Sequence, residues 1–403
     1  MQEQYLQSLT VLISENSFMK IFKLILLIVL ILQGCVMQFI PQIEEYREYI
    51  VVDGLITDQN NSYKIAVSKT SPIGGEKFTK IPLGGCVVTV TDDLGNHYYM
   101  FEKNYGLYVS DSLTFRGVAG RKYTLHITTG GHSYESFPME MKTVPPIDSV
   151  YAEIINNDTY QLGKIVPGYQ VYFDTHDPLN ECRFYRWDFT ETWEFSIPYI
   201  FEDIVNSTCW KTANSNKIYL ENTSSLLEDR VTKFPLNFIT TETDRLKIKY
   251  SLLLRQYSLN EDEYNYWGKL KRITEDVGGL YDVVPMSIES NIYCTDSPSE
   301  KVLGYFSVSS VASKRIFINN TLRGFPDFYG YCPFDTVPVG TPISNLNITI
   351  FILQELNPTL TSPFSYVLTM NKECVDCTRS GSNKRPDFWN ITKNDVVIQS
   401  VFK

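Results

Sequence analysis

The 403-residue chain contains 46 Asp and Glu, eight Cys and four His that could carry out acid–base, nucleophilic or metal chemistry, but their spacing matches no familiar catalytic motif. None of the four histidines belongs to an HExxH pair, and there is no G-x-S-x-G elbow, Walker loop or dinucleotide-binding glycine motif. The net charge of −10 comes without a basic stripe, which argues against nucleic-acid binding. We therefore expect a protein that is not an enzyme and has no catalytic residues.

The densest polar cluster consists of Asp174, His176, Asp177 and Asn180. Asp174 and Asp177 could ligate a structural Ca²⁺ through their carboxylate oxygens. The same residue types are typical of a turn built on side-chain-to-backbone hydrogen bonds, and we favour the turn. No other cofactor is expected.

An aromatic run over residues 183–195 alternates with the two-residue period of a strand. Tyr185, Trp187 and Trp193 share one face of this strand with Glu191. Bulky rings on one sheet face usually pack in a core; the alternative is a stacking platform for a glycan or peptide ligand. Glu191 and Glu194 could act as the carboxylate pair of a glycosidase, but charges on an exposed sheet edge explain them equally well.

Seven cysteines remain once Cys35 is set aside, so at least one of them stays free if the others form disulfides. Cys374 and Cys377 are the only close pair. A zinc site would need a second such pair, and a redox motif would need a βαβ context. We expect both to be oxidised, either as a short-loop disulfide or with two separate partners.

Short alternating runs separated by Gly and Asp/Asn turns dominate the chain, which contains 27 Tyr and 23 Phe. They predict a mainly β fold: an immunoglobulin- or transthyretin-like β-sandwich over residues 48–145, then a larger β-rich domain over 146–403. Pro145-Pro146 marks the boundary. One main α-helix is expected over 259–276, with Ser258 and Glu261 forming a capping box.

The apolar run over residues 22–32 is about half the ~20 residues that a membrane span requires. Lys20 and Lys23 precede it, and Leu32-Gln33-Gly34-Cys35 after it resembles the lipobox of bacterial lipoproteins. We therefore expect residues 1–35 to be a signal peptide whose true start is Met19, and residues 36–47 to be a tether. Cys35 is the expected lipidation site.

Several stretches, taken together, resemble a family of Bacteroidota outer-membrane lipoproteins known as domain of unknown function four-two-four-nine. The resemblance rests on the lipobox cysteine and on four further stretches in order: 49–56, 184–187 with 191–193, 301–309, and 374–377 with 384–389. It implies a lipid-anchored protein of the outer membrane, facing the cell exterior, that accompanies a TonB-dependent transporter as a ligand-binding or accessory subunit. The ligand would be a peptide or a glycan. An envelope hydrolase and a structural or adhesive surface protein are the alternatives.

Overall fold

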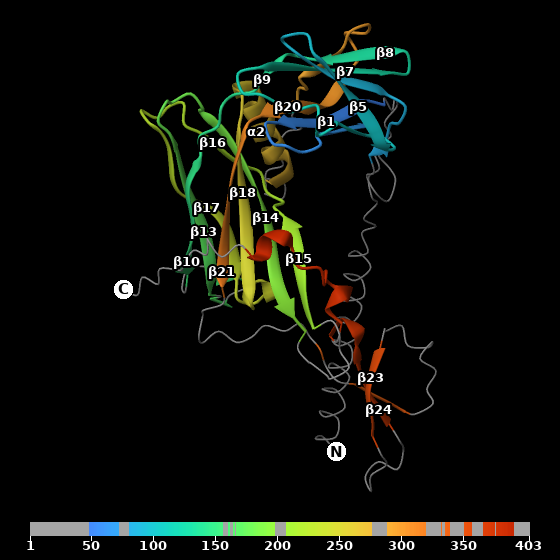
Figure 1. Cartoon of the computed structure of the whole chain (residues 1–403), viewed down its shortest axis with the longest axis vertical. Helices are drawn as coiled ribbons and strands as arrows, with labels where there is room; N and C mark the ends of the chain where they lie inside the picture. The colour runs from blue at the N-terminus through green and yellow to red at the C-terminus, as the bar shows by residue number, and fades with distance from the viewer. Residues whose placement is uncertain are drawn as a thin grey trace, which may run out of the picture. The chain divides into compact units, whose positions relative to one another are not determined.

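The computed structural model describes residues 48–71, 80–155, 160–161, 164–165, 167–197, 207–275, 288–319, 332, 335–338, 350–356, 366–374 and 376–390. Strands account for most of these residues, as Figure 1 shows. This confirms the expected mainly β class with one main helix. In the described part of the chain, none of the helices has the length and apolar character needed to span a bilayer. The expected signal peptide, Cys35 and the tether lie outside the described residues.

Eleven strands form the first sheet, which we call the N-terminal sheet; its order is β19-β8-β7-β4-β5-β6-β2-β1-β20, with β3 paired to β2 and β9 to β7. Alternation builds these strands: β7 buries Tyr123, Leu125 and Ile127 and turns the residues between them outward. The bounds are β1 Ile50–Thr57, β2 Lys64–Lys69, β3 Ile81–Pro82, β4 Val87–Asp92, β5 His97–Asn104, β6 Leu107–Val109, β7 Lys122–Thr129, β8 His132–Ser136, β9 Met139–Glu140, β19 Ile292–Cys294 and β20 Val302–Ser309.

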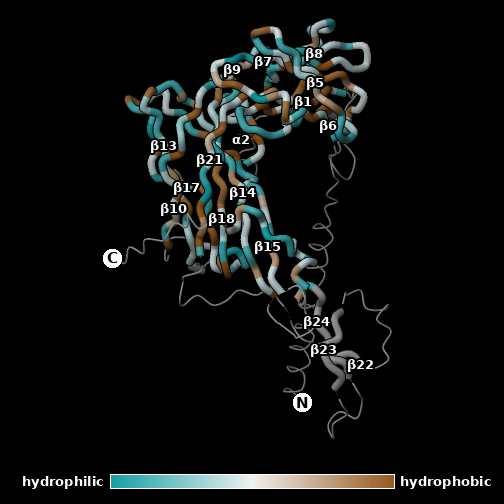
Figure 2. Tube along the Cα trace, in the orientation of Figure 1, coloured by the Kyte–Doolittle hydropathy of each residue, from teal (hydrophilic) through white to brown (hydrophobic). Residues whose placement is uncertain are grey.

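Two further sheets share one hydrophobic core and form what we call the central sandwich. One has the order β10-β13-β17; the other has the order β15-β14-β18-β21, with β16 paired to β14. Figure 1 labels these long strands, and Figure 2 shows apolar residues along them. The bounds are β10 Ile147–Ile155, β13 Gly168–Asp177, β14 Phe184–Ser196, β15 Thr208–Asn214, β16 Tyr219–Asn222, β17 Asp229–Thr240, β18 Lys249–Ser258 and β21 Val311–Asn319.

The smaller elements complete the description. A two-stranded sheet pairs β11 with β12, and a three-stranded sheet has the order β22-β24-β23. The bounds are β11 Tyr160–Gln161, β12 Lys164–Ile165, β22 Asp335–Pro338, β23 Ile350–Leu356 and β24 Tyr366–Asn371, with short 3-10 helices η1 Asp244–Leu246, η3 Lys372–Cys374, η4 Cys377–Arg379 and η5 Asp387–Asn390.

The N-terminal sheet is not continuous in sequence. Strand β20 pairs with β1 in parallel, and β19 pairs with β8, so residues 292–309 complete a sheet begun at residue 50. Strand β21 starts only two residues after β20 ends and belongs to the central sandwich. The expected boundary at Pro145-Pro146 falls in the link between β9 and β10.

Helix α2 spans Glu261–Glu275 and begins one turn from the end of β18. The expected capping box is wrong. Ser258 instead ends β18, where its hydroxyl donates to the Lys142 carbonyl oxygen at 2.7 Å and accepts from the Ser310 N–H at 3.2 Å. The backbone carbonyl of Asn260 accepts the Tyr264 N–H, which starts the helix two residues later than the capping box requires.

Candidate functional site

A pocket of about 490 Å³, which we call the α2 pocket, opens beside helix α2. Helix α2, strand β20 and the segment between β8 and β9 contribute to its wall. The lining mixes aromatic rings with amide, carboxylate and ammonium groups, a composition that suits a polar ligand with flat apolar faces. The lining residues are Phe137, Pro138, Met139, Asp262, Asn265, Tyr266, Lys269, Glu289, Ser290, Asn291 and Tyr305.

Tyr305 lines the α2 pocket and carries a buried hydroxyl. Its side chain is 6% exposed, and among the described residues its hydroxyl has no hydrogen-bond partner. Burial raises the pKa of this hydroxyl, so it stays a neutral donor. A buried polar group without a partner costs stability, and because this hydroxyl oxygen is itself buried, the surface that Tyr305 can offer to a ligand is its ring.

Neighbouring side chains hold Tyr305 in place. The Tyr266 ring lies against the Tyr305 ring with their centroids 4.5 Å apart. Asn291 is buried, and its amide clamps the backbone of β20 by donating to the Phe306 carbonyl at 2.8 Å and accepting the Phe306 N–H at 2.9 Å. The aromatic floor of the pocket is therefore rigid before any ligand arrives.

Glu263 lies fully buried on the same helix as Tyr266. Burial raises the pKa of its carboxyl to about 7. Hydrogen bonds to Ser307 and Trp267 and the charge of Arg186 favour the ionised form and partly oppose this rise. The Trp267 indole N–H donates to Oε1 at 3.3 Å, and the Arg186 guanidinium stacks on the Trp267 ring at 4.7 Å. A titratable group thus sits directly behind the pocket.

A second depression, of about 510 Å³, lies over β5. Tyr99 and Phe101 on this strand are 63% and 62% exposed, and the stacked rings of Tyr98 and Phe115, 4.0 Å apart, contribute to its wall. It offers aromatic surface but no buried polar group without a partner among the described residues. The α2 pocket is therefore the stronger ligand site.

The expected aromatic platform is core and not a ligand surface. Tyr185 and Trp187 are fully buried, and Trp193 is 6% exposed. The Trp187 ring packs between Phe173 and Phe234, whose ring centroids lie 5.0 and 5.2 Å away. The sheet β10-β13-β17 thus covers the face of β14 that carries these rings, and no ligand can stack there.

The expected calcium ligands do not converge. Asp174 and Asp177 are three residues apart on β13, so they point to opposite faces of the strand. The Asp177 carboxylate accepts three backbone N–H bonds, from Leu179, Glu181 and Cys182 at 2.8–3.0 Å. This is the turn that the sequence favoured, and these donors lower the pKa of Asp177 although burial opposes them.

Glu191 and Glu194 are likewise separate, and the expectation of an exposed edge is wrong for Glu191. Strand β14 lies inside its sheet, and Glu191 is buried. Its carboxylate accepts from Arg245 Nε at 3.0 Å and Nη2 at 2.8 Å, and from the Tyr250 hydroxyl at 3.0 Å. Glu194 accepts the Trp389 indole N–H at 2.8 Å. Both carboxylates serve in structural contacts.

Cys374 and Cys377 are both oxidised, but not with each other. Cys377 bonds to Cys209 of β15, and Cys374 bonds to Cys332. Of the two alternatives that the sequence left open, the structure has separate partners. Cys86, Cys182 and Cys294 are free and buried.

Sequence reasoning missed the α2 pocket and a cluster of potential metal ligands at an edge of the N-terminal sheet. The cluster brings together His132, Cys294 and Glu300, whose ligand atoms lie within 4.8 Å of one another. Cys294 and Glu300 are six residues apart, and distant His132 becomes their neighbour because β19 pairs with β8. The helix expected over residues 259–276 is the sequence feature nearest to the pocket, because it carries Tyr266.

One family model matches the chain. It carries the description Domain of unknown function (DUF4249) and covers residues 37–315, which is more than half of the sequence. The match spans β1 to most of β21, and the cysteines at 374 and 377 lie beyond it. No curated protein matches the sequence. The chain belongs to the family described as Domain of unknown function (DUF4249).

Proposed function

We propose that this protein is a cell-surface outer-membrane lipoprotein that acts as the ligand-binding or accessory subunit of a TonB-dependent transporter. The observation that carries the proposal is the lipobox-like Leu32-Gln33-Gly34-Cys35 after a short apolar run with basic flanks. The resemblance described above supplies the Bacteroidota setting and the transporter. Lipid on Cys35 anchors the chain to the membrane, and the proposal assigns it no catalytic step.

The α2 pocket supports the ligand-binding part of this role. Its rings can lie against the flat face of a sugar or an aromatic side chain, and Asn265, Lys269 and Asp262 offer donors and acceptors at its rim. These are the chemistries that a glycan or a peptide presents. We place the captured ligand against the rings of Tyr266 and Tyr305, which line the pocket.

Copurification tests the partner. The full chain, carrying a C-terminal affinity tag, is recovered from detergent-solubilised outer membranes of its own cells, and the bound proteins are identified by mass spectrometry. We expect a TonB-dependent barrel in an amount comparable to the tagged chain. The matched control is Cys35→Ala, which lacks the lipid and should no longer bring the barrel down from the membrane. Recovery of the wild-type chain without any such barrel would contradict the proposal.

Arrays of glycans and peptides test the pocket. Tyr266→Ala removes a lining ring and should abolish binding of whichever glycans or peptides the wild-type protein binds on the arrays. Tyr264→Ala is the matched control, since this tyrosine is also half-buried on α2 but packs against Phe184, outside the pocket. Equal loss in both variants would show that binding does not occur in the α2 pocket.

A further inference from the structure

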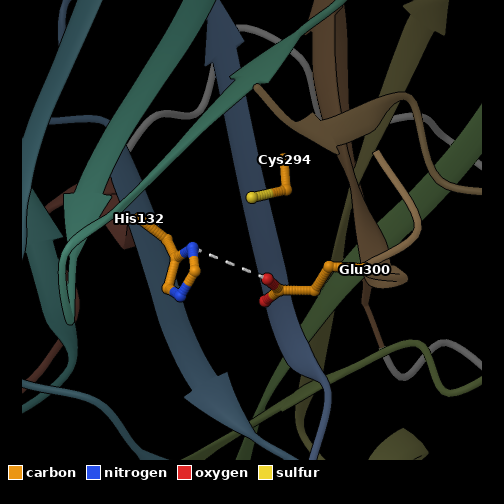
Figure 3. Close-up of side chains that lie close together, drawn as sticks. All are labelled: His132, Cys294 and Glu300. Carbon is orange, nitrogen blue, oxygen red and sulfur yellow. Dashed lines mark ion pairs between the residues drawn. The ribbon is translucent and has the colours of Figure 1, made fainter. Parts of the chain in front are cut away.

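Four side chains with metal-binding atoms gather where β8 meets β19 and the loop that follows. His132 starts β8, Cys294 ends β19, and Asp296 and Glu300 lie in the loop that leads to β20. Figure 3 shows His132, Cys294 and Glu300 directed toward a common space. His132 Nδ1 lies 3.1 Å from an Asp296 oxygen and 4.0 Å from a Glu300 oxygen, and Cys294 Sγ lies 3.8 Å from Asp296 Oδ1.

Backbone contacts hold this cluster in shape. The Thr295 N–H donates to the Ser133 carbonyl at 2.8 Å, and the Ser133 N–H donates to Asp296 Oδ1 at 2.9 Å. The Tyr134 hydroxyl donates to Glu300 Oε1 at 2.6 Å. These bonds tie the loop to β8 and orient both carboxylates, as outer partners orient the ligands of protein metal sites.

The cluster has a buried base and an exposed rim, so an ion could enter it from solvent. Cys294 is 1% exposed and lies at the base. The side chains of His132 and Asp296 are 48% and 44% exposed, and that of Glu300 is 28% exposed. Ion pairs between His132 and the two carboxylates, and a weak hydrogen bond from the Cys294 thiol to Asp296, hold these residues together without a metal, and they leave a thiol, an imidazole and two carboxylates facing one space.

We propose that His132, Cys294, Asp296 and Glu300 form a binding site for a divalent transition-metal ion, with Zn²⁺ as the best match. One imidazole nitrogen, one sulfur and carboxylate oxygens form a borderline-soft set that zinc accepts readily, whereas Ca²⁺ and Mg²⁺ take oxygen ligands. Two carboxylates add the negative charge that attracts a cation. Ligand atoms around tetrahedral zinc lie about 3.5 Å apart, and those of His132, Cys294 and Glu300 already lie within 4.8 Å of one another, with Asp296 beside His132 and Cys294.

Cobalt provides the test, because thiolate bound to Co²⁺ gives a charge-transfer absorption that oxygen and nitrogen ligands do not. The full chain, purified in detergent, is stripped with a chelator, kept under a phosphine reductant and titrated with Co²⁺ and then Zn²⁺. We expect a thiolate-to-cobalt band that saturates at one ion per chain and disappears when Zn²⁺ displaces Co²⁺.

Single variants decide whether the band comes from this cluster. Cys294→Ser should remove it, whereas Cys86→Ser, which changes another buried free cysteine, should keep it. His132→Gln changes an exposed ligand, so the test stays decisive if Cys294→Ser fails to fold. Losing an outer-shell partner weakens metal binding about 10- to 100-fold, and we expect the loss of the ligand His132 to weaken Zn²⁺ binding by at least as much. Absence of the band in the wild type, its persistence in Cys294→Ser, or unchanged affinity in His132→Gln would each overturn the proposal.

Discussion

Glu263 makes the stability of the protein depend on pH in a direction opposite to the usual behaviour of carboxylates. Its pKa is about 7 in the folded state and 4.5 in an exposed chain, so the folded state holds the proton more tightly. The stabilising contribution is complete below about pH 4.5 and is lost as pH rises through about 7. A difference of about 2.5 pH units corresponds to about 3 kcal/mol of unfolding free energy.

Glu263→Gln keeps the shape of the side chain and removes its ionisation. We expect the variant to match the wild type near pH 4.5 and to exceed it at pH 8, by up to about 3 kcal/mol. Urea unfolding of residues 36–403, followed by tryptophan fluorescence between pH 4.5 and 8, measures this difference. Glu261→Gln is the control, because Glu261 is exposed in the same helical turn and should give a pH-independent difference near zero. The reasoning fails if Glu263→Gln shows the same difference at both pH values or is less stable at pH 8.

Three further changes test other parts of the fold by the same unfolding assay. Replacing Cys209 and Cys377 by Ala opens a loop with a sequence separation of 168 and should cost about 5 kcal/mol; a loss below about 1 kcal/mol would contradict this. Gly304→Ala should cost more than about 2 kcal/mol because its φ is +89° and the added Cβ meets a backbone carbonyl of β1, whereas Gly268→Ala in open space on α2 should stabilise by about 0.5–1 kcal/mol. Arg245→Met leaves its buried carboxylate partner without a cation and should cost about 3 kcal/mol; an unchanged midpoint would refute that role.

Local alternation in the sequence predicted which side chains share a face of strand β14. Tyr185 and Trp187 lie on the buried face of β14, as the two-residue period requires, because that period depends only on the extended backbone. Gly and Asp/Asn turns between short runs likewise predicted the β class. The sequence also predicted helix α2, although not its first residue, since Ser258 is used by tertiary contacts.

Contacts between distant segments were not predictable from these patterns. The sequence left open whether Cys374 and Cys377 form a local bridge or have separate partners, and it gave no sign that Cys377 pairs with Cys209 across 168 residues of sequence. Similarly, β20, which carries Tyr305 of the α2 pocket, pairs in parallel with β1. The residue spacing along a strand does not reveal which other strand will lie beside it. From the sequence, Glu191 was interpreted as a surface charge, because its partner Arg245 lies 54 residues away in the chain.

Crosslinking in intact cells tests the central proposal most directly. A membrane-impermeant, lysine-reactive reagent is added to living cells, and the crosslinked peptides of the full chain are identified by mass spectrometry. We expect links between lysines of this chain and extracellular loops of a TonB-dependent barrel, since both partners would then be exposed on the cell surface. A chain that stays unlabelled in intact cells but becomes labelled after the outer membrane is opened, or one that is labelled but never linked to such a barrel, would contradict the proposed role.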